Sequence, residues 1–280
     1  MTDTKYTRQI VTAVRPWVPG KLFSLRVTRD PGFAFQAGQF ARVGLPAAEM
    51  PDAEPTLWRA YSMVSAPDEP ELEFYSIVVP EGEFSPRMAQ LREGDALYVE
   101  KKPFGFLTLD RFEAGGSLWL LASGTGLSAY LSMLRDPATW ARFDRIVVVH
   151  GVRHAEELAY RDEIERLPDN PALASYFAQR PDKLRYLPVA TREALPDTPQ
   201  ARLTTLLADG RLETLLGETL DPAQVKSCFA ATLRCFPMPG NCWPNAASHR
   251  VGAAYRATWP SKITGKPRFY AAFSQQFDVQ

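Results

Sequence analysis

Three neighbouring residues in the first half of the chain could hold a phosphorylated aromatic ligand. Arg59, Tyr61 and Ser62 lie in the run from Trp58 to Ser65, whose residues suit a β-strand. Arg59 and Tyr61 then share one face of the strand, while Ser62 is on the other. A guanidinium pairs with phosphate oxygens, a flat ring covers a planar ligand, and a hydroxyl bonds to its polar edge. These residues predict a flavin nucleotide site, although Arg and Tyr are also common on exposed strands.

A glycine turn in the second half is the other candidate site. Residues 118–122 form a continuous apolar run, residues 123–126 read Ser-Gly-Thr-Gly, and residues 127–134 have the composition of an apolar helix. A buried strand that turns through glycines into a helix begins a doubly wound α/β domain, which binds ligands at the carboxyl ends of its strands. The turn therefore predicts a nucleotide site. The dinucleotide fingerprint is only approximated, because Leu127 follows Gly126.

Three arginines follow the strands that we expect next in this domain. Residues 145–149 and 184–190 read as buried strands, and Arg153 and Arg192 come soon after them, while Arg202 precedes an amphipathic run. Guanidinium groups bind phosphate oxygens through paired hydrogen bonds, so these residues predict a phosphate clamp. No acidic residue ends the strand 145–149, which favours the cofactor with a 2′-phosphate, NADP. The alternative is three solvated arginines.

The elements that must position these residues divide the chain in two. The first half contains short runs of strand-forming residues, separated by turns with Pro or Gly, at residues 10–14, 22–27, 40–45, 59–64, 72–79 and 96–100. Short strands at this spacing predict a small antiparallel barrel, which alone implies no ligand. We expect a six-stranded antiparallel β-barrel over residues 1–114 and a doubly wound parallel α/β domain over residues 115–225.

These motifs resemble those of the ferredoxin–NADP reductase family, and most closely its bacterial branch, which uses ferredoxin or flavodoxin. Arg-x-Tyr-Ser-x-x-Ser at residues 59–65, Glu-Phe-Tyr at 73–75 and Phe-Gly-Phe-Leu at 104–107 recur there in this order, as does the Gly-Thr-Gly turn. The resemblance covers about residues 6–224. It implies that the barrel binds FAD and that the α/β domain binds NADP(H).

The resemblance also implies roles for individual residues. The residues expected to contact FAD are Arg59, Tyr61, Ser62, Tyr75, Ser85 and Thr125. The residues expected to contact NADP are Gly124, Gly126, Arg153, Arg192 and Arg202. Arg59 would face the pyrophosphate of FAD, Tyr61 would stack on the flavin and Ser62 would bond to its edge. Thr125 would lie near both flavin and nicotinamide, so Tyr61, Ser62 and Thr125 form the expected catalytic centre.

The activity implied is that of an FAD-dependent oxidoreductase. It would pass electrons between NADPH and a one-electron carrier, ferredoxin or flavodoxin, by hydride transfer to or from flavin N5. His150 and His154 are expected to be structural, because this hydride transfer needs no proton shuttle. Two alternatives stay open. One is the reductase component of an oxygenase, although no iron–sulfur domain with cysteine ligands is recognisable. The other is a flavin-binding relic inactivated by its altered C-terminus.

Composition limits the partners. Lys and Arg together number 32, as do Asp and Glu, so the summed charge gives no reason to expect nucleic acid. No apolar run is long enough to span a bilayer and the N-terminus is polar, so we expect a cytoplasmic protein without a membrane partner. Cys228, Cys235 and Cys242 fit neither a disulfide framework nor a zinc site. We expect no metal, and a monomer is the default for this architecture.

The end of the chain breaks the pattern. The resemblance stops at about Val225, and residues 235–244 have no usable periodicity. If the reading frame has slipped by one nucleotide, codons for residues 258–266 can be regrouped as Asn-Leu-Ala-Val-Glu-Asn-Tyr-Trp and a stop. Codons for residues 227–233 can likewise give Val-Met-Leu-Cys-Gly-Asn-Pro. Both match the expected family terminus, so we predict that residues 226–280 are a frameshifted tail that impairs folding or weakens nicotinamide binding.

Overall fold

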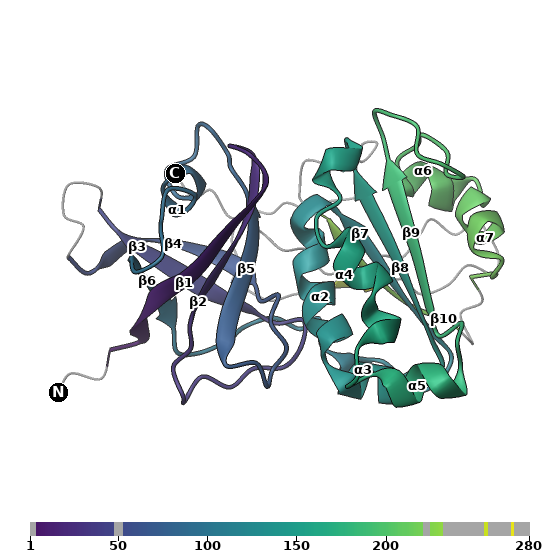
Figure 1. Cartoon of the computed structure of the whole chain (residues 1–280), viewed down its shortest axis with the longest axis horizontal. Coiled ribbons are helices and arrows are strands. Elements are labelled where there is room, and N and C mark those ends of the chain that lie inside the picture. Colours follow the sequence, from purple (N-terminus) through teal and green to yellow (C-terminus); the bar gives the residue numbers. More distant parts are fainter. Residues whose placement is uncertain (1–3, 48–52, 221–224, 232–254, 257–269, 272–280) are drawn as a thin grey trace.

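The chain forms two domains that lie side by side (Figure 1). The computed structural model describes residues 4–47, 53–220, 225–231, 255–256 and 270–271. A six-stranded antiparallel sheet makes up the N-terminal domain, and a parallel sheet with helices on its faces makes up the C-terminal domain. The predicted fold class is therefore confirmed.

The N-terminal sheet curls into a barrel. Its strands are β1 (Tyr6–Val18), β2 (Leu22–Thr28), β3 (Phe40–Pro46), β4 (Pro55–Ser62), β5 (Glu71–Ile77) and β6 (Ala96–Glu100). They are ordered β4-β3-β6-β1-β2-β5. An antiparallel bridge between Met63, just after β4, and Phe74 in β5 joins the two ends of this order. Both side chains lie in the apolar core of the barrel, and the short helix α1 (Ser85–Met88) follows β5.

The C-terminal sheet is built as a doubly wound domain. Its parallel strands are β7 (Ser117–Ser123), β8 (Arg145–Val152), β9 (Leu184–Ala190) and β10 (Val225–Ala231), in the order β10-β7-β8-β9. The helices are α2 (Leu127–Arg135), α3 (Pro137–Arg142), α4 (Arg161–Glu165), α5 (Ala174–Gln179), α6 (Leu203–Ala208) and α7 (Arg211–Leu216). Alternate strand residues pack into two separate apolar clusters, one with α2, α3, α4 and α5 and the other with α6 and α7. The sheet is thus covered on both faces.

The first residues of the predicted frameshifted tail form a strand of this sheet, within β10. Residues 225–231 pair in parallel with residues 117–123 of β7. Sheet pairing uses backbone N–H and C=O groups, which an altered sequence still provides. Two short strands, β11 (Tyr255–Arg256) and β12 (Tyr270–Ala271), continue the sheet beyond β10. The rest of the predicted frameshifted tail lies outside the described residues.

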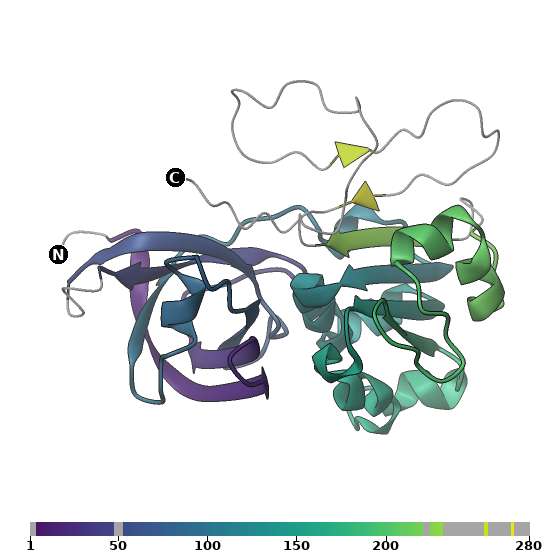
Figure 2. The same ribbon diagram turned by 90° about the horizontal axis from the view of Figure 1, so that it is seen from above.

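The two domains share an apolar core. Helix α2 lies between the barrel and the parallel sheet in both views (Figures 1 and 2). Val64 and Tyr75 of the barrel belong to the same buried cluster as Leu120 of β7 and Met133 of α2. Continuous apolar burial across the boundary favours one fixed arrangement of the domains over independent motion.

Candidate functional site

The residues of the predicted flavin motif lie along β4. Arg59 is half-buried, and its guanidinium donates a hydrogen bond to the carbonyl of Trp58 at 2.9 Å. Ser62 is the last residue of β4 and is also half-buried. Tyr61 is only 5% exposed, and its ring packs in the barrel core with its centroid 5.8 Å from that of Phe84. Arg59 and Ser62 thus present surface to a ligand, while the stacking role of Tyr61 stays a prediction.

Ser85 begins helix α1 and is buried beneath the same part of the barrel. Its hydroxyl accepts a hydrogen bond from the backbone N–H of Val79 at 2.9 Å. This contact fixes the loop between β5 and α1, next to Phe84, whose ring packs on Tyr61. The structure brings Ser85 close to the flavin motif through that ring, and the predicted contact with FAD stays a prediction.

Tyr75 lies at the domain interface, in the same buried cluster as Val64 of the flavin motif. Its neighbour Phe74 faces the barrel interior, so Tyr75 points outward from β5 into the domain interface. The ring is perpendicular to that of Tyr160, with centroids 5.2 Å apart, and burial raises the pKa of its hydroxyl. Within the described residues this buried hydroxyl has no hydrogen-bond partner. The predicted contact between Tyr75 and FAD stays a prediction.

The glycine turn fits a nucleotide phosphate. It forms a short 3-10 turn, Gly124–Gly126, that leads directly into α2, with Gly126 at the helix start. Gly124 has a φ of +54°, and a Cβ there would meet no atom within 4 Å, so the space beside the turn is open. No side chain caps α2, which leaves backbone N–H groups at its start for an anion. Thr125 is half-buried, and its carbonyl accepts a hydrogen bond from Ser128.

The structure brings the three predicted arginines to one edge of the sheet. Arg153 follows β8 and Arg192 follows β9, and the backbone N–H of Arg192 donates to the carbonyl of Arg153 at 2.9 Å. Arg202 is at the start of α6. The next residue, Leu203, packs closely onto Gly151 of β8, since a Cβ on Gly151 would lie 2.9 Å from the Leu203 Cγ. All three are exposed, and their guanidinium groups make no ion pair with any described residue.

The buried histidine is neutral. His150 is fully buried in β8, with its Nδ1 3.2 Å from the hydroxyl of Tyr186. Burial lowers the pKa of His150 to about 4. His154 is half-buried and its Nδ1 lies 3.6 Å from Glu193. These surroundings agree with the structural roles that we expected for both residues.

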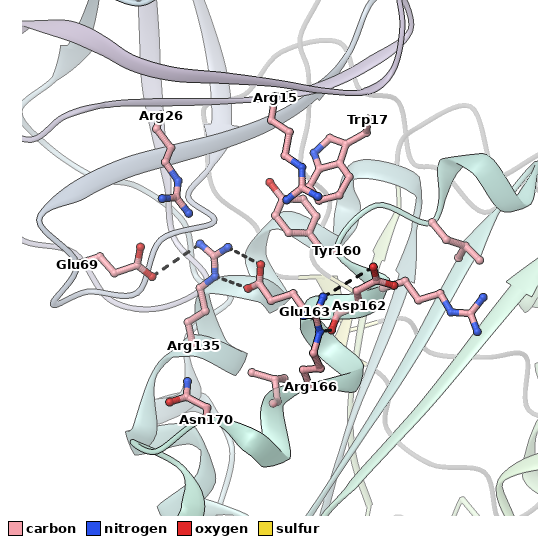
Figure 3. A pocket seen from close by; sticks show the side chains of 13 residues that line it. Arg15, Trp17, Arg26, Glu69, Arg135, Tyr160, Asp162, Glu163, Arg166 and Asn170 are labelled. Atoms are coloured by element: carbon pink, nitrogen blue, oxygen red, sulfur yellow. Dashed lines mark hydrogen bonds and ion pairs between the residues drawn. The ribbon is translucent and has the colours of Figure 1, made fainter.

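One polar cluster at the domain interface was not predicted from the sequence. Glu73 of the barrel contacts Arg135 and Tyr160 of the other domain. Arg135 also binds Glu163 and lies 3.7 Å from the carboxylate of Glu69 (Figure 3). The available signal was Glu73 between the apolar residues Leu72 and Phe74 of a strand, since a charge in a buried position needs a partner. The sequence could not say which residue the partner is.

Among the described residues, no three side chains of His, Cys, Asp or Glu gather where they could hold a metal ion. None of the helices in the described part of the chain has the length and apolar character to cross a bilayer. The three cysteines, Cys228, Cys235 and Cys242, have side chains outside the described set.

An antiparallel barrel against a doubly wound domain with a glycine turn is the architecture of a two-domain nucleotide-binding protein. The family described as oxidoreductase NAD-binding domain matches residues 120–209. Ferredoxin–NADP reductase A of Sorangium cellulosum is 42% identical over 219 residues, which are 78% of this chain and 75% of that protein. Ferredoxin–NADP reductase of Pseudomonas aeruginosa is 43% identical over 209 residues, 74% of this chain and 76% of that protein.

A solved structure gives the same result. A ferredoxin NADP+ reductase from Neisseria gonorrhoeae with bound FAD and NADP superposes with a TM-score of 0.75 at 25% identity, covering 98% of this chain and all of that one. The chain belongs to the ferredoxin/flavodoxin–NADP reductase family. The predicted family and enzyme class, an FAD-dependent oxidoreductase that uses NADP, are therefore confirmed.

Proposed function

We propose that this chain binds FAD at the rim of the barrel and NADP(H) at the carboxyl edge of the parallel sheet. It passes electrons between NADPH and a one-electron carrier, ferredoxin or flavodoxin. The observation that carries this proposal is the set of three exposed arginines beside an open glycine turn, Arg153, Arg192 and Arg202. The names of the relatives support ferredoxin or flavodoxin as the carrier.

The barrel residues bind and orient FAD in this proposal. FAD, when bound, supplies the chemistry, since it accepts a hydride and releases electrons one at a time. Arg59 is a half-buried cation suited to the pyrophosphate, and Ser62 offers a hydroxyl at the end of β4 to the edge of the flavin. Tyr61 supports the flavin from the barrel side, and Ser85 fixes the loop that approaches its phosphates.

The second domain binds NADP(H). Gly124 and Gly126 let the pyrophosphate approach the start of α2, where N–H groups and the helix dipole favour an anion. Arg153, Arg192 and Arg202 bind the 2′-phosphate, which distinguishes NADP from NAD. Thr125, between the glycines, orients the nicotinamide toward the flavin. Position and electrostatics are thus the contribution of the protein.

We further propose that the protein works as a monomer in the cytoplasm and meets its carrier in a transient complex. The relatives are named as bacterial reductases of ferredoxin or flavodoxin, which supports this setting. The summed charge of the chain is zero, so recognition of the carrier depends on local surface charge. The oxygenase-reductase alternative has no observation in its favour.

An absorbance spectrum of the purified protein, before and after addition of NADPH without oxygen, tests the proposal. A flavin spectrum that bleaches with NADPH, and much more slowly with NADH, would support the proposal and would show that the predicted effect of the tail on nicotinamide binding is wrong. A colourless protein, or a flavin that NADPH leaves oxidised, would contradict it. In the second case, a gene with the reading frame restored after the Gln224 codon tests the predicted frameshift. Recovery of bleaching would assign the defect to the tail.

A further inference from the structure

A cavity of about 620 Å³ opens between the two domains (Figure 3). Arg15, Trp17 and Arg26 line it from the barrel, while Arg135 and Tyr160 line it from the other domain. Arg15 stacks on Trp17 with 3.6 Å between the guanidinium carbon and the ring centroid. Arg135 and Tyr160 belong to the polar cluster that connects the domains, and Glu73 of that cluster lines a smaller neighbouring cavity.

Glu73 is the centre of that cluster. It is only 4% exposed, yet its carboxylate accepts hydrogen bonds from Arg135 at 2.8 Å and from the Tyr160 hydroxyl at 2.7 Å. Arg26 of β2 adds a contact at 3.3 Å. Burial acts to raise the pKa of Glu73, but Arg135, Tyr160 and Arg26 together hold it below its usual value. The buried carboxylate is therefore ionised and paired across the domain boundary.

Arg135 divides its guanidinium between the two domains. It donates one hydrogen bond to Glu73 of the barrel and two to Glu163 of α4, at 2.7 and 3.0 Å. A further hydrogen bond from Arg135 reaches the Val64 carbonyl at 3.4 Å. The planar group fixes the directions of these bonds, as a lysine ammonium could not. Arg135 thus sets the orientation of the last turn of α2 relative to β5.

Helix α2 connects this cluster to the nucleotide turn. It begins directly after Gly124–Gly126 and ends at Arg135, so its nine residues span about 13 Å. A helix is stiff over this length, and a rotation at one end moves the other. The orientation that Arg135 sets is therefore transmitted to Thr125 and its neighbouring glycines.

The same helix is connected to the end of the flavin motif. The Ser132 hydroxyl donates to the backbone carbonyl of Ser65 at 2.6 Å, and the Ser65 hydroxyl accepts from the Glu73 backbone N–H at 2.6 Å. Ser65 comes three residues after Ser62. The segment between them is thus held by β5 on one side and by α2 on the other.

We propose that Glu73, Arg135 and Tyr160 are positioning residues for hydride transfer. They hold the end of the flavin motif at a fixed place relative to the Gly124–Gly126 turn, so they set the rate of the step and not the affinity for either cofactor. The shared apolar core already keeps the domains together. A buried polar cluster contributes more to the relative orientation of the domains than to the free energy of their association. This inference rests on the proposed function.

Two variants test it. The double variant Glu73→Gln/Arg135→Gln removes both charges together, so that no buried charge is left unpaired. Tyr160→Phe removes one hydrogen bond and keeps the ring. We expect FAD content and the dissociation constant for NADP+ to stay within about twofold of the wild type. The single-turnover rate of flavin reduction by NADPH should fall about tenfold or more in the double variant and less in Tyr160→Phe, because small misplacements of reacting groups are costly.

A matched control comes from the same cavity. Arg161 lines it and makes an exposed ion pair with Glu165 at 2.8 Å, so Arg161→Gln should leave the rate unchanged. Unaltered flavin reduction in the double variant would overturn the inference, as would an equal loss in the control. Loss of FAD from the double variant alone would also overturn it, because the cluster would then serve folding. A wild-type protein without FAD or NADPH oxidation would instead refute the proposed function.

Discussion

The buried His150 predicts a specific loss of stability in mild acid. Its ring is fully buried, and its pKa is lowered from 6.5 to about 4 because protonation would place a charge in the apolar core. The folded protein therefore binds fewer protons than the unfolded chain between these pH values. The contribution of neutral His150 to the stability of the folded protein is fully present above pH 6.5 and is lost as the pH falls toward 4.

The magnitude follows from the two pKa values. Each pKa unit corresponds to about 1.4 kcal/mol, so the full difference is about 3 kcal/mol, and about 2 kcal/mol is already lost at pH 5. Glu73 and Glu157 also have pKa values in the folded protein below their ordinary value of 4.5, so they too stabilise less as the pH falls, but at lower pH than His150. Their contributions are lost only below about pH 4.5. The interval from pH 6.5 to 5 therefore isolates the histidine.

Urea unfolding at several pH values provides the assay, with His150→Gln as the comparison. The glutamine keeps a polar atom for the Tyr186 hydroxyl, which lies 3.2 Å from His150, and does not titrate. The wild type should lose about 2 kcal/mol more than the variant between pH 7.5 and 5. Equal losses in the two proteins would refute the reasoning. They would mean that the pKa of His150 in the folded protein is close to its value in the unfolded chain.

Three further predictions concern the site and its scaffold. Arg153→Ala and Arg192→Ala should each raise the KM for NADPH about 10-fold to 100-fold and leave that for NADH nearly unchanged, in steady-state assays, because charged hydrogen bonds contribute about 1.5–3 kcal/mol. Ser62→Ala should slow single-turnover flavin reduction about 10-fold or more with unchanged FAD content; an unaltered rate would exclude its hydroxyl. Gly38→Ala should cost about 2 kcal/mol or more in thermal unfolding, since a Cβ would lie 1.9 Å from the Leu107 carbonyl at a φ of +93°.

The elements of the nucleotide half could be read from the sequence because their signals are local. The strand predicted at residues 184–190 is β9, and the helix predicted at residues 127–134 is α2 with one residue more. Arg153 and Arg192 meet because parallel strands place their carboxyl ends at one edge, which is a rule of the fold and not of these residues. The local sequence pattern and this rule of the fold were together sufficient to predict these elements and the arginines at their ends.

The position of Tyr61 shows where local pattern stops. Alternation places Tyr61 and Met63 on one face of β4, and both do lie in one cluster. Alternation cannot say which face is the inner one, and here the barrel closes over that face through the Met63–Phe74 bridge. The strand pattern therefore predicted that Met63 shares a face with Tyr61, but it could not predict that this face lies inside the barrel.

The interdomain cluster was beyond the sequence for a different reason. Glu73 is 62 residues from Arg135 and 87 residues from Tyr160, and the three meet only when two domains dock. Each residue alone has an ordinary explanation, as a strand residue, a helix end and a core tyrosine. Contacts between domains depend on a relative orientation that no local periodicity encodes.

The charges on α2 support a nucleotide at the turn independently of the glycine motif. Arg135 is in the last turn, where a cation is favoured by the helix dipole, and no acidic side chain occupies the first turn. Glu73 and Glu163 neutralise the cation at one end, while the N–H groups at the other end have no side-chain cap. A cofactor phosphate would supply the missing anion. A phosphate at the start of α2 and the ion pairs of Arg135 at its end then favour the same orientation of the helix. One helix can therefore bind the nucleotide and connect the two domains.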